Sequence, residues 1–445
     1  MGEKLGLRSA VSMALGGMIG GGIYAVLGIV VAAAGATAWL AFLLAGAVAL
    51  CAGYAYVSLN RRVGHPGGAV VFVQEYLDSS TTAGMVGWTL LVGYLGSMAM
   101  YAFAFGSYFV DLTGVSLAAT LPIVGAVPVA RPAASLAVVG AFVALNVLGV
   151  RETGAVEDLL VAAKIAVLGV FALVGLHYGW QRGSLTLGLG GIGGVGALTA
   201  AASSFVAFQG WQLLFYDQDS MATPRRTLPR AVFVAIPVAV AIYVAIALVT
   251  VAIVPDLVRQ RPETALAVAA GEFLGPAGRA VIGASALVST ASAINATLFS
   301  SSLLTQRLVT DDLLPPRIGA ADGEIDGTPP ASAVVVLGGI TAAFAVLGSL
   351  QGITSFASLS FIVVFGGACA LALRNAGKLG CSRLIPAVGL LGCGTFFPLL
   401  FLRLYRAEPA TFRTVVVVAV VVVSVELLYF RRPGLYKRVR ESLTR

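Results

Sequence analysis

One lysine of this sequence lies where a positive charge is costly. Lys164 is in the middle of the apolar run 153–177, and a helical rise of ~1.5 Å per residue puts it about 20 Å from either end of that run. Its side chain is too short to reach water from there, and a charge at mid-membrane costs at least ~2.5 kcal/mol. We therefore predict that Lys164 belongs to a functional site. The alternative is a structural lysine that donates to backbone carbonyls of neighbouring helices.

Glycine is concentrated in the first apolar run, at Gly16, Gly17, Gly20, Gly21 and Gly22. So many glycines give too little helix propensity to keep a regular turn, and we predict that the helix unwinds from Gly20 to Gly22, next to Ile23. An unwound turn frees N–H groups that attract a carboxylate and C=O groups that attract a cation or an ammonium. The alternative is that these glycines only allow close helix packing.

A second interruption lies in the sixth apolar run, where Phe208, Gln209, Gly210 and Trp211 follow one another. The Gln-Gly step weakens the helix. The alternative, as for the first run, is that the glycine only allows close packing of helices. Phe208 and Trp211 could form an aromatic wall of a binding site or pack as ordinary core aromatics. Because two breaks offer a partner to each end of a zwitterion, we predict a substrate site at Gly20, Gly21, Gly22, Ile23, Phe208, Gln209, Gly210 and Trp211.

The elements that position these residues are membrane helices. The chain has 445 residues, 58% of them apolar and 11% charged, with a mean hydropathy of +0.95, so it is an integral membrane protein. A spanning segment must satisfy its own backbone, and the long apolar runs favour helices over a β-barrel. Twelve spans are predicted, at 9–34, 36–60, 80–110, 132–149, 153–177, 194–220, 229–254, 278–309, 331–349, 353–374, 383–403 and 411–430.

The two breaks are separated by five predicted spans. An odd number of spans in each unit turns the second unit upside down in the membrane, which is typical of inverted repeats with discontinuous helices. We predict one transmembrane domain over residues 1–445. It would consist of a first repeat at 9–177, a second at 194–374, two peripheral helices at 383–430 and a basic tail at 431–445.

The distribution of positive charge predicts the orientation. An even number of spans puts both termini on one side, and about two thirds of the Lys and Arg residues, among them Lys4, Arg62 and Arg226, fall on that side. This places both termini in the cytoplasm, and we expect the lipid bilayer to be that of the cell membrane. The net charge of +8 is then explained by positive residues on the cytoplasmic side, and no nucleic-acid partner is expected.

The sequence does not indicate a metal site or an enzyme active site. The four cysteines, Cys51, Cys369, Cys381 and Cys393, have no metal-binding spacing, and His65 and His177 lie near loop edges. A membrane-embedded enzyme would need a group of titratable side chains within the spans. We therefore predict no metal, no cofactor, no catalytic residues and a protein that is not an enzyme.

Three motifs stand in a characteristic order. Gly20-Gly21-Gly22-Ile23-Tyr24 is similar to a GxGI(F/Y) break in a first helix, and residues 205–211 are similar to an F-x-A-[FY]-x-G-[FW] break in a sixth helix. Residues 289–297 are similar to the end of an eighth helix. Together they resemble the amino acid–polyamine–organocation superfamily of transporters over about residues 5–430.

This resemblance implies ten core helices in two inverted repeats, two peripheral helices, and substrate bound at both breaks. It also implies a role for Lys164, because proton-coupled members that do not use sodium often place a lysine of the fifth helix at the sodium position, with Ser289 or Ser292 of the eighth helix beside it. Burial disfavours the charged form of an amine, so proton release becomes accessible. Asp219 stands alone where the family has two acids, which predicts a weaker cytoplasmic gate at Asp219.

We therefore predict a secondary active transporter that imports an amino acid by alternating access, without sodium and coupled to H⁺. No acidic residue lies within either break, which favours a small neutral amino acid over a polyamine, since a polyamine would need a carboxylate partner. The alternatives are a transporter of another amine, a polyamine or an ion, and a non-transporting sensor of the same fold. The side-chain specificity, the choice among symport, exchange and uniport, and the oligomeric state stay open at this point.

Overall fold

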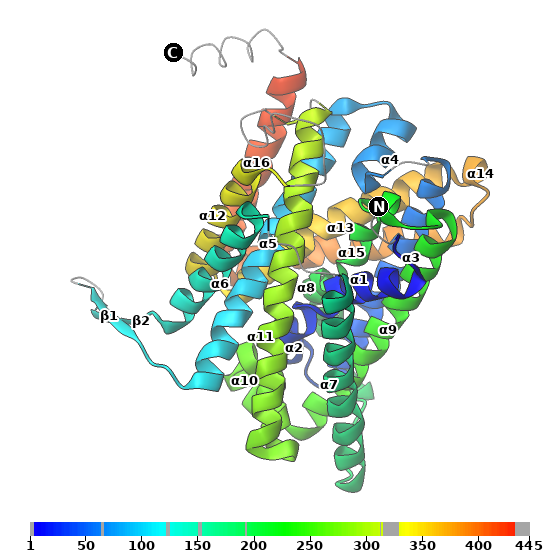
Figure 1. The fold of residues 1–445 in the computed structure, drawn as a ribbon. Coiled ribbons are helices and arrows are strands. Elements are labelled where there is room, and N and C mark those ends of the chain that lie inside the picture. Colours follow the sequence, from blue (N-terminus) through cyan, green and yellow to red (C-terminus); the bar gives the residue numbers. More distant parts are fainter. Residues whose placement is uncertain are drawn as a thin grey trace.

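The computed structural model describes residues 4–63, 66–121, 125–149, 154–191, 194–311, 313–314 and 329–431. Apart from one short hairpin, these residues form an all-α membrane protein (Figure 1). Eight helical segments are long and apolar enough to cross a membrane, and further apolar helices of 10–17 residues accompany them. The predicted basic tail, 431–445, lies outside the described residues from 432 onwards.

Within the described residues, the first half of the chain forms seven α-helices and a hairpin. The helices are α1 (Leu7–Ile19), α2 (Gly22–Ala34), α3 (Ala38–Val63), α4 (Gly68–Leu77), α5 (Ser80–Thr113), α6 (Ala130–Val147) and α7 (Gly154–Gln181). A 3₁₀ turn, η1 (Gly35–Thr37), joins α2 to α3. The antiparallel strands β1 (Ala118–Leu121) and β2 (Gly125–Pro128) form the hairpin between α5 and α6.

The part of the second half that the structure describes continues with nine α-helices. They are α8 (Val195–Ser204), α9 (Pro224–Ile253), α10 (Pro255–Gln260), α11 (Ala265–Thr310), α12 (Ala331–Leu347), α13 (Leu350–Arg374), α14 (Ala376–Leu379), α15 (Leu384–Ala407) and α16 (Pro409–Arg431). Five 3₁₀ turns lie among them, η2 (Leu189–Gly191), η3 (Phe205–Phe208), η4 (Trp211–Phe215), η5 (Gln218–Ser220) and η6 (Pro262–Thr264).

Each predicted span coincides with helical residues of the structure, within a few residues at its ends. The span predicted at 278–309 is the part of α11 that follows a kink at Gly275, where φ is 67° and Pro276 comes next. The span predicted at 194–220 is divided into α8, η3, η4 and η5. Several short elements lie outside the predicted spans, among them α4, α10, α14 and the hairpin. Ten residues are too few for α4 to cross a membrane, so the search for long apolar runs passed over it.

Local signals fix several helix ends. Ser79 Oγ accepts a hydrogen bond of 3.2 Å from the backbone N–H of Thr82 at the start of α5, and Gly114 ends that helix in the left-handed region. Ser349 caps α13 in the same way, through the N–H of Gly352 at 3.0 Å. Pro224 begins α9 at a position where a missing N–H costs nothing.

Helices pack against the partners that a five-plus-five repeat would give them. The halves of the first discontinuous helix contact those of the sixth, since α2 packs on α8 and α1 packs on η4. Likewise α3 contacts α9, α5 contacts α11 and α6 contacts α12. In Figure 1, α4, α14 and the end of α16 lie at the upper end, α10 and the end of α7 lie at the lower end, and the hairpin projects to the left. We call these the inner end and the outer end, after the predicted orientation.

Candidate functional site

The first helix is interrupted where the glycines predict it. Helix α1 ends at Ile19 and α2 begins at Gly22, so Gly20 and Gly21 form the break, and Ile23 is fully buried beyond it. The ring of Tyr101 stands directly over the break, because a Cβ on Gly21 would lie 2.0 Å from Tyr101 Cδ1. Any side chain at Gly21 would have to displace that ring.

The second break lies at Gln209 and Gly210. Gln209 is extended, and Gly210 has φ 129°, a conformation that favours glycine. A Cβ on Gly210 would lie 2.5 Å from the carbonyl carbon of Gly17. The two discontinuous helices therefore touch backbone to backbone, and glycine is required on both sides of this contact.

A buried chain of hydrogen bonds connects the second break to α5. Gln209 Nε2 donates to Tyr101 Oη at 2.6 Å, and Gln212 Nε2 donates to Gln209 Oε1 at 3.2 Å. The backbone N–H of Gly210 donates to Gln212 Oε1 at 2.7 Å. These groups are uncharged and almost completely buried, so the break offers amides and a phenol rather than an ion.

One tyrosine of α9 reaches both breaks. The hydroxyl of Tyr243 lies within hydrogen-bonding distance of two backbone oxygens, that of Met18 at 2.7 Å and that of Ala207 at 3.2 Å. These carbonyls belong to the ends of helical segments, where intrahelical partners run out. Tyr243 therefore satisfies backbone groups that the breaks leave free, although nothing in its sequence position marks it for this role.

The two predicted wall aromatics are fully buried. Phe208 packs against Tyr243, with ring centroids 5.2 Å apart. Trp211 packs against Tyr56 at 5.0 Å and against Phe365 at 5.1 Å. Both rings thus contact protein in this conformation.

Lys164 is 3% exposed and donates to Ser292 Oγ at 2.5 Å. Ser292 Oγ also lies 3.3 Å from the backbone oxygen of Ser289. Ser289 is fully buried one turn away. Of the two candidate serines, Ser292 accepts this hydrogen bond from the ammonium. Nearby, Asn146 Nδ2 donates to Asn295 Oδ1 at 2.8 Å and joins α6 to α11.

A cavity of about 310 Å³ lies between α1, α7 and α11 at the inner end. Lys164 and Ser292 line it, as do the carboxylates of Glu157, Asp158 and Asp217. Gly16 and Gly17 line it too, whereas Gly20 to Ile23 and Phe208 to Trp211 do not. The structure thus brings together the predicted ion-coupling pair in an accessible space and keeps the predicted substrate-binding residues tightly packed beside it.

The predicted gate residue Asp219 is exposed and does not line this cavity, unlike Asp217, which accepts a short hydrogen bond from Ser220 Oγ. The start of the chain is hydrogen-bonded to the segment that follows Asp219. Leu5 N–H donates to the oxygen of Ser220 at 2.8 Å, and Ala222 N–H donates to the oxygen of Leu5 at 3.2 Å.

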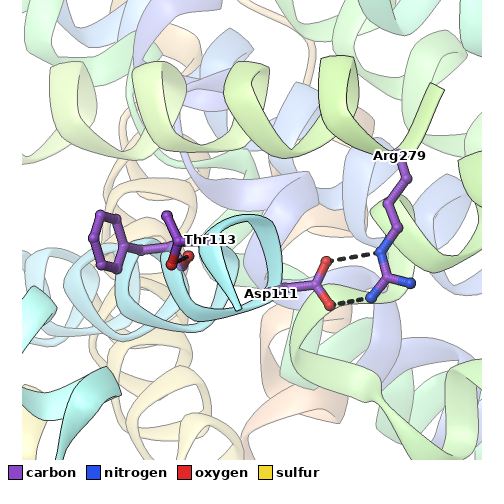
Figure 2. Close-up of polar contacts among 4 residues, drawn as sticks. Asp111, Thr113 and Arg279 are labelled. Atoms are coloured by element: carbon purple, nitrogen blue, oxygen red, sulfur yellow. Dashed lines mark hydrogen bonds and ion pairs between the residues drawn. The ribbon is translucent and has the colours of Figure 1, made fainter. Parts of the chain in front are cut away.

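Polar contacts join neighbouring helices at the outer end. Asp111 of α5 forms a two-point ion pair with Arg279 of α11, with Nε and Oδ2 3.1 Å apart (Figure 2). Closer to the break, Tyr24 Oη and Ser285 Oγ are 2.7 Å apart, and Ser107 Oγ donates to Glu263 Oε2 at 3.1 Å. With a cavity at the inner end and these contacts outside, the molecule is in a conformation closed toward its outer end.

Over residues 5–425 the chain matches the family model described as amino acid permease. The chain belongs to this family of membrane transporters. Inner membrane transport protein YbaT of Escherichia coli is 30% identical over 87% of both chains. The methylthioribose transporter of Bacillus subtilis is 25% identical over 68% of this chain and 66% of its own. The branched-chain amino acid permease BcaP of the same species is 25% identical over 57% and 55%.

Three site residues escaped the sequence analysis, Tyr243, Glu157 and Asp158. Tyr243 lies 225 positions from Met18 in the chain, and a tyrosine within an apolar run carries no mark of that contact. The two acids stand near the start of an apolar run, where an acid at a helix N-terminus is common. Among the described residues, no group of three His, Cys, Asp or Glu side chains is placed to hold a metal ion.

Proposed function

We propose that this permease is a secondary active transporter that imports a small neutral amino acid across the cell membrane, driven by protons and without sodium. In this orientation both termini are cytoplasmic, and the repeats are those predicted at 9–177 and 194–374. The observation on which the proposal chiefly rests is Lys164, whose ammonium is buried and bonded to Ser292 between α7 and α11.

The breaks favour a zwitterion without a charged side chain. Backbone groups at Gly20, Gly21 and Gly210 can receive the carboxylate and the ammonium that all amino acids share. The side chains around them, Tyr101, Gln209 and Gln212, carry no charge. A cationic or anionic side chain would therefore be buried without a counter-charge, at considerable cost.

A fixed ammonium explains how the carrier would work without sodium. Lys164 supplies one positive charge where it can bridge α7 and α11, and loss of its proton would remove that charge and weaken the bridge. Protonation would thereby be coupled to the packing of helices around the first break. Proton release would take place while the inner end is open, and Asp219 or Asp217 would gate that end.

Uptake into proteoliposomes tests this function. Radiolabelled L-alanine, L-leucine, L-lysine, L-glutamate, putrescine and methylthioribose are each offered in sodium-free buffer, with and without an inside-alkaline pH gradient. We expect accumulation of alanine or leucine only with the gradient. Accumulation of putrescine or methylthioribose alone would overturn the substrate class, and gradient-independent equilibration of an amino acid would overturn the coupling.

A further inference from the structure

A carboxylate of α7 shares its cavity with Lys164. Glu157 and Lys164 are seven residues apart, which is about two helical turns, and Val161 lies between them; all three line the cavity. They therefore occupy one face of α7. Glu157 lies against the inner half of the first helix, since its Oε1 is 3.8 Å from the place a Cβ on Gly16 would take.

The cavity connects a buried group to the inner end. Lys164 is 3% exposed, whereas Glu157 and Asp158 are half-buried nearer the start of α7. Two turns correspond to about 10 Å along the helix axis between the backbone positions of Glu157 and Lys164, and the two long side chains cover part of this distance. A cavity of about 310 Å³ with polar walls has room for several water molecules that could span this distance.

The other charged groups around the cavity are few. Asp158 lies on α7 beside Glu157 and accepts a hydrogen bond of 3.1 Å from Ser9 Oγ of α1, and Asp217 accepts one from Ser220. The lining residues of α11, Ser292, Asn295 and Ser300, do not titrate, and no described residue of α9 lines the cavity. Asp158 therefore binds α1 and Asp217 binds within its own loop. Glu157 lies on the same face of α7 as Lys164.

We propose that Glu157 is the proton acceptor through which Lys164 discharges toward the cytoplasm. This rests on the proposed proton coupling. An N–H bond of the Lys164 ammonium breaks and an O–H bond forms on the Glu157 carboxylate through intervening water, which leaves a neutral amine and a neutral acid. The acid then releases the proton to water at the inner end, and the carboxylate is restored. Glu157 acts on the proton and has no contact with the substrate.

Measurements of two transport modes distinguish a proton-relay role of Glu157 from a structural role. Net uptake of radiolabelled L-alanine under an inside-alkaline gradient requires one proton release per cycle, whereas exchange of internal for external alanine at equal pH does not. For Glu157→Gln we expect net uptake to fall about a hundredfold, the lower end of what one general acid–base group contributes, while exchange stays within about twofold of the wild type. Proton flux, read from a pH dye trapped in the vesicles, should fall with net uptake.

Asp158→Asn is the matched control, because it makes the same chemical change at the next residue. The asparagine keeps an oxygen that can accept from Ser9 Oγ but removes the carboxylate, so we expect any effect on net uptake and on exchange to be equal. Glu157→Asp should recover much of the net uptake. Retained exchange shows that each variant is folded.

The outcomes discriminate between the two proposals. If the wild type ignores the pH gradient, the proton coupling is wrong and the relay is wrong with it. If the wild type responds and Glu157→Gln transports normally in both modes, or loses both modes equally, the relay alone is overturned.

Discussion

Gly210 lies where a side chain would be unfavourable both for its backbone conformation and for the space around it. Its φ of 129° is strained for any residue with a side chain, and the added Cβ would meet Gly17 at 2.5 Å. Strain of this kind costs about 1–3 kcal/mol. We expect Gly210→Ala to lose most uptake while it still inserts into the membrane. Gly339→Ala of α12 is the control, because a Cβ there meets open space, and uptake at wild-type level by Gly210→Ala would contradict the contact.

Gly21 tests the first break in a similar way. A leucine there would have to displace the ring of Tyr101, which lies 2.0 Å from the position of the new Cβ. We expect Gly21→Leu to abolish substrate binding, measured by scintillation proximity with radiolabelled L-alanine, while the yield of folded protein in detergent stays similar. Binding at unchanged affinity would remove this break from the substrate site.

Lys164 has a measurable signature of its own. Because its hydrogen bond to Ser292 is stronger when Lys164 is an ammonium, we expect Lys164→Ala to flatten the dependence of uptake on external pH. Ser292→Ala should weaken uptake and keep its pH dependence, because the amine can still titrate. If Lys164→Ala keeps the wild-type pH profile, the lysine is a structural tie between helices.

Sequence reasoning locates residues that violate a local rule and misses those that obey it. Lys164 and the glycines of both breaks are conspicuous because charge in lipid and glycine in a helix are both unfavourable. Glu157 obeys the rule for an acid at a helix start, and Tyr243 obeys the rule for an aromatic in a core. Their roles arise only when α1, α7 and α9 are brought together in space.

On the scale of elements, the discontinuous helices depend on α9 for their shape. Removing the hydroxyl of Tyr243 leaves a buried carbonyl of Met18 or Ala207 without this partner, which costs about 1–3 kcal/mol. We expect Tyr243→Phe to lower the free energy of unfolding by that amount, seen as a lower Tm, and to raise the KM for uptake. Tyr56→Phe is the matched control, because the buried hydroxyl of Tyr56 has no hydrogen-bond partner among the described residues. The Tm of this variant should be close to that of the wild type. Equal melting of both variants would show that the two carbonyls are satisfied in another way.

The long helices were predictable from length and apolarity, because lipid allows few other solutions. The 3₁₀ geometry of η3 and η4 was not predictable. It follows from tertiary contacts, among them Ser358 Oγ, which accepts from the N–H of Val206 at 3.1 Å and donates to the oxygen of Ser203 at 2.8 Å. A short element such as α4 falls below the length that periodicity can recognise.

For the whole molecule, the ion pair between Asp111 and Arg279 fastens α5 to α11 at the outer end. The Arg279 side chain is 38% exposed, so water screens the pair and its coupling is about 1 kcal/mol or less. A double-mutant cycle of Asp111→Asn and Arg279→Gln, followed by thermal unfolding, measures this coupling. A value above about 3 kcal/mol would indicate a buried network rather than a surface pair.

Orientation in the membrane is testable with two exposed positions at opposite ends. Thr113 lies at the outer end of α5, and Lys378 lies in α14 at the inner end. In intact cells we expect a membrane-impermeant maleimide to label Thr113→Cys and to label Lys378→Cys only after permeabilisation. Cys381, which is partly exposed, is first changed to serine. The reverse labelling pattern would place both termini outside.

Trp211 also gives the molecule an optical reporter. Of the four tryptophans, Trp211 alone is fully buried, while Trp39 and Trp88 are partly buried and Trp180 is 79% exposed. A variant that keeps Trp211 and carries phenylalanine at the other three positions would have a single tryptophan fluorophore. The surroundings of this fluorophore would change when Tyr56 and Phe365 move relative to it. Its emission wavelength would report when the second break becomes hydrated, so the opening rate of this permease could be followed in stopped flow without any attached dye.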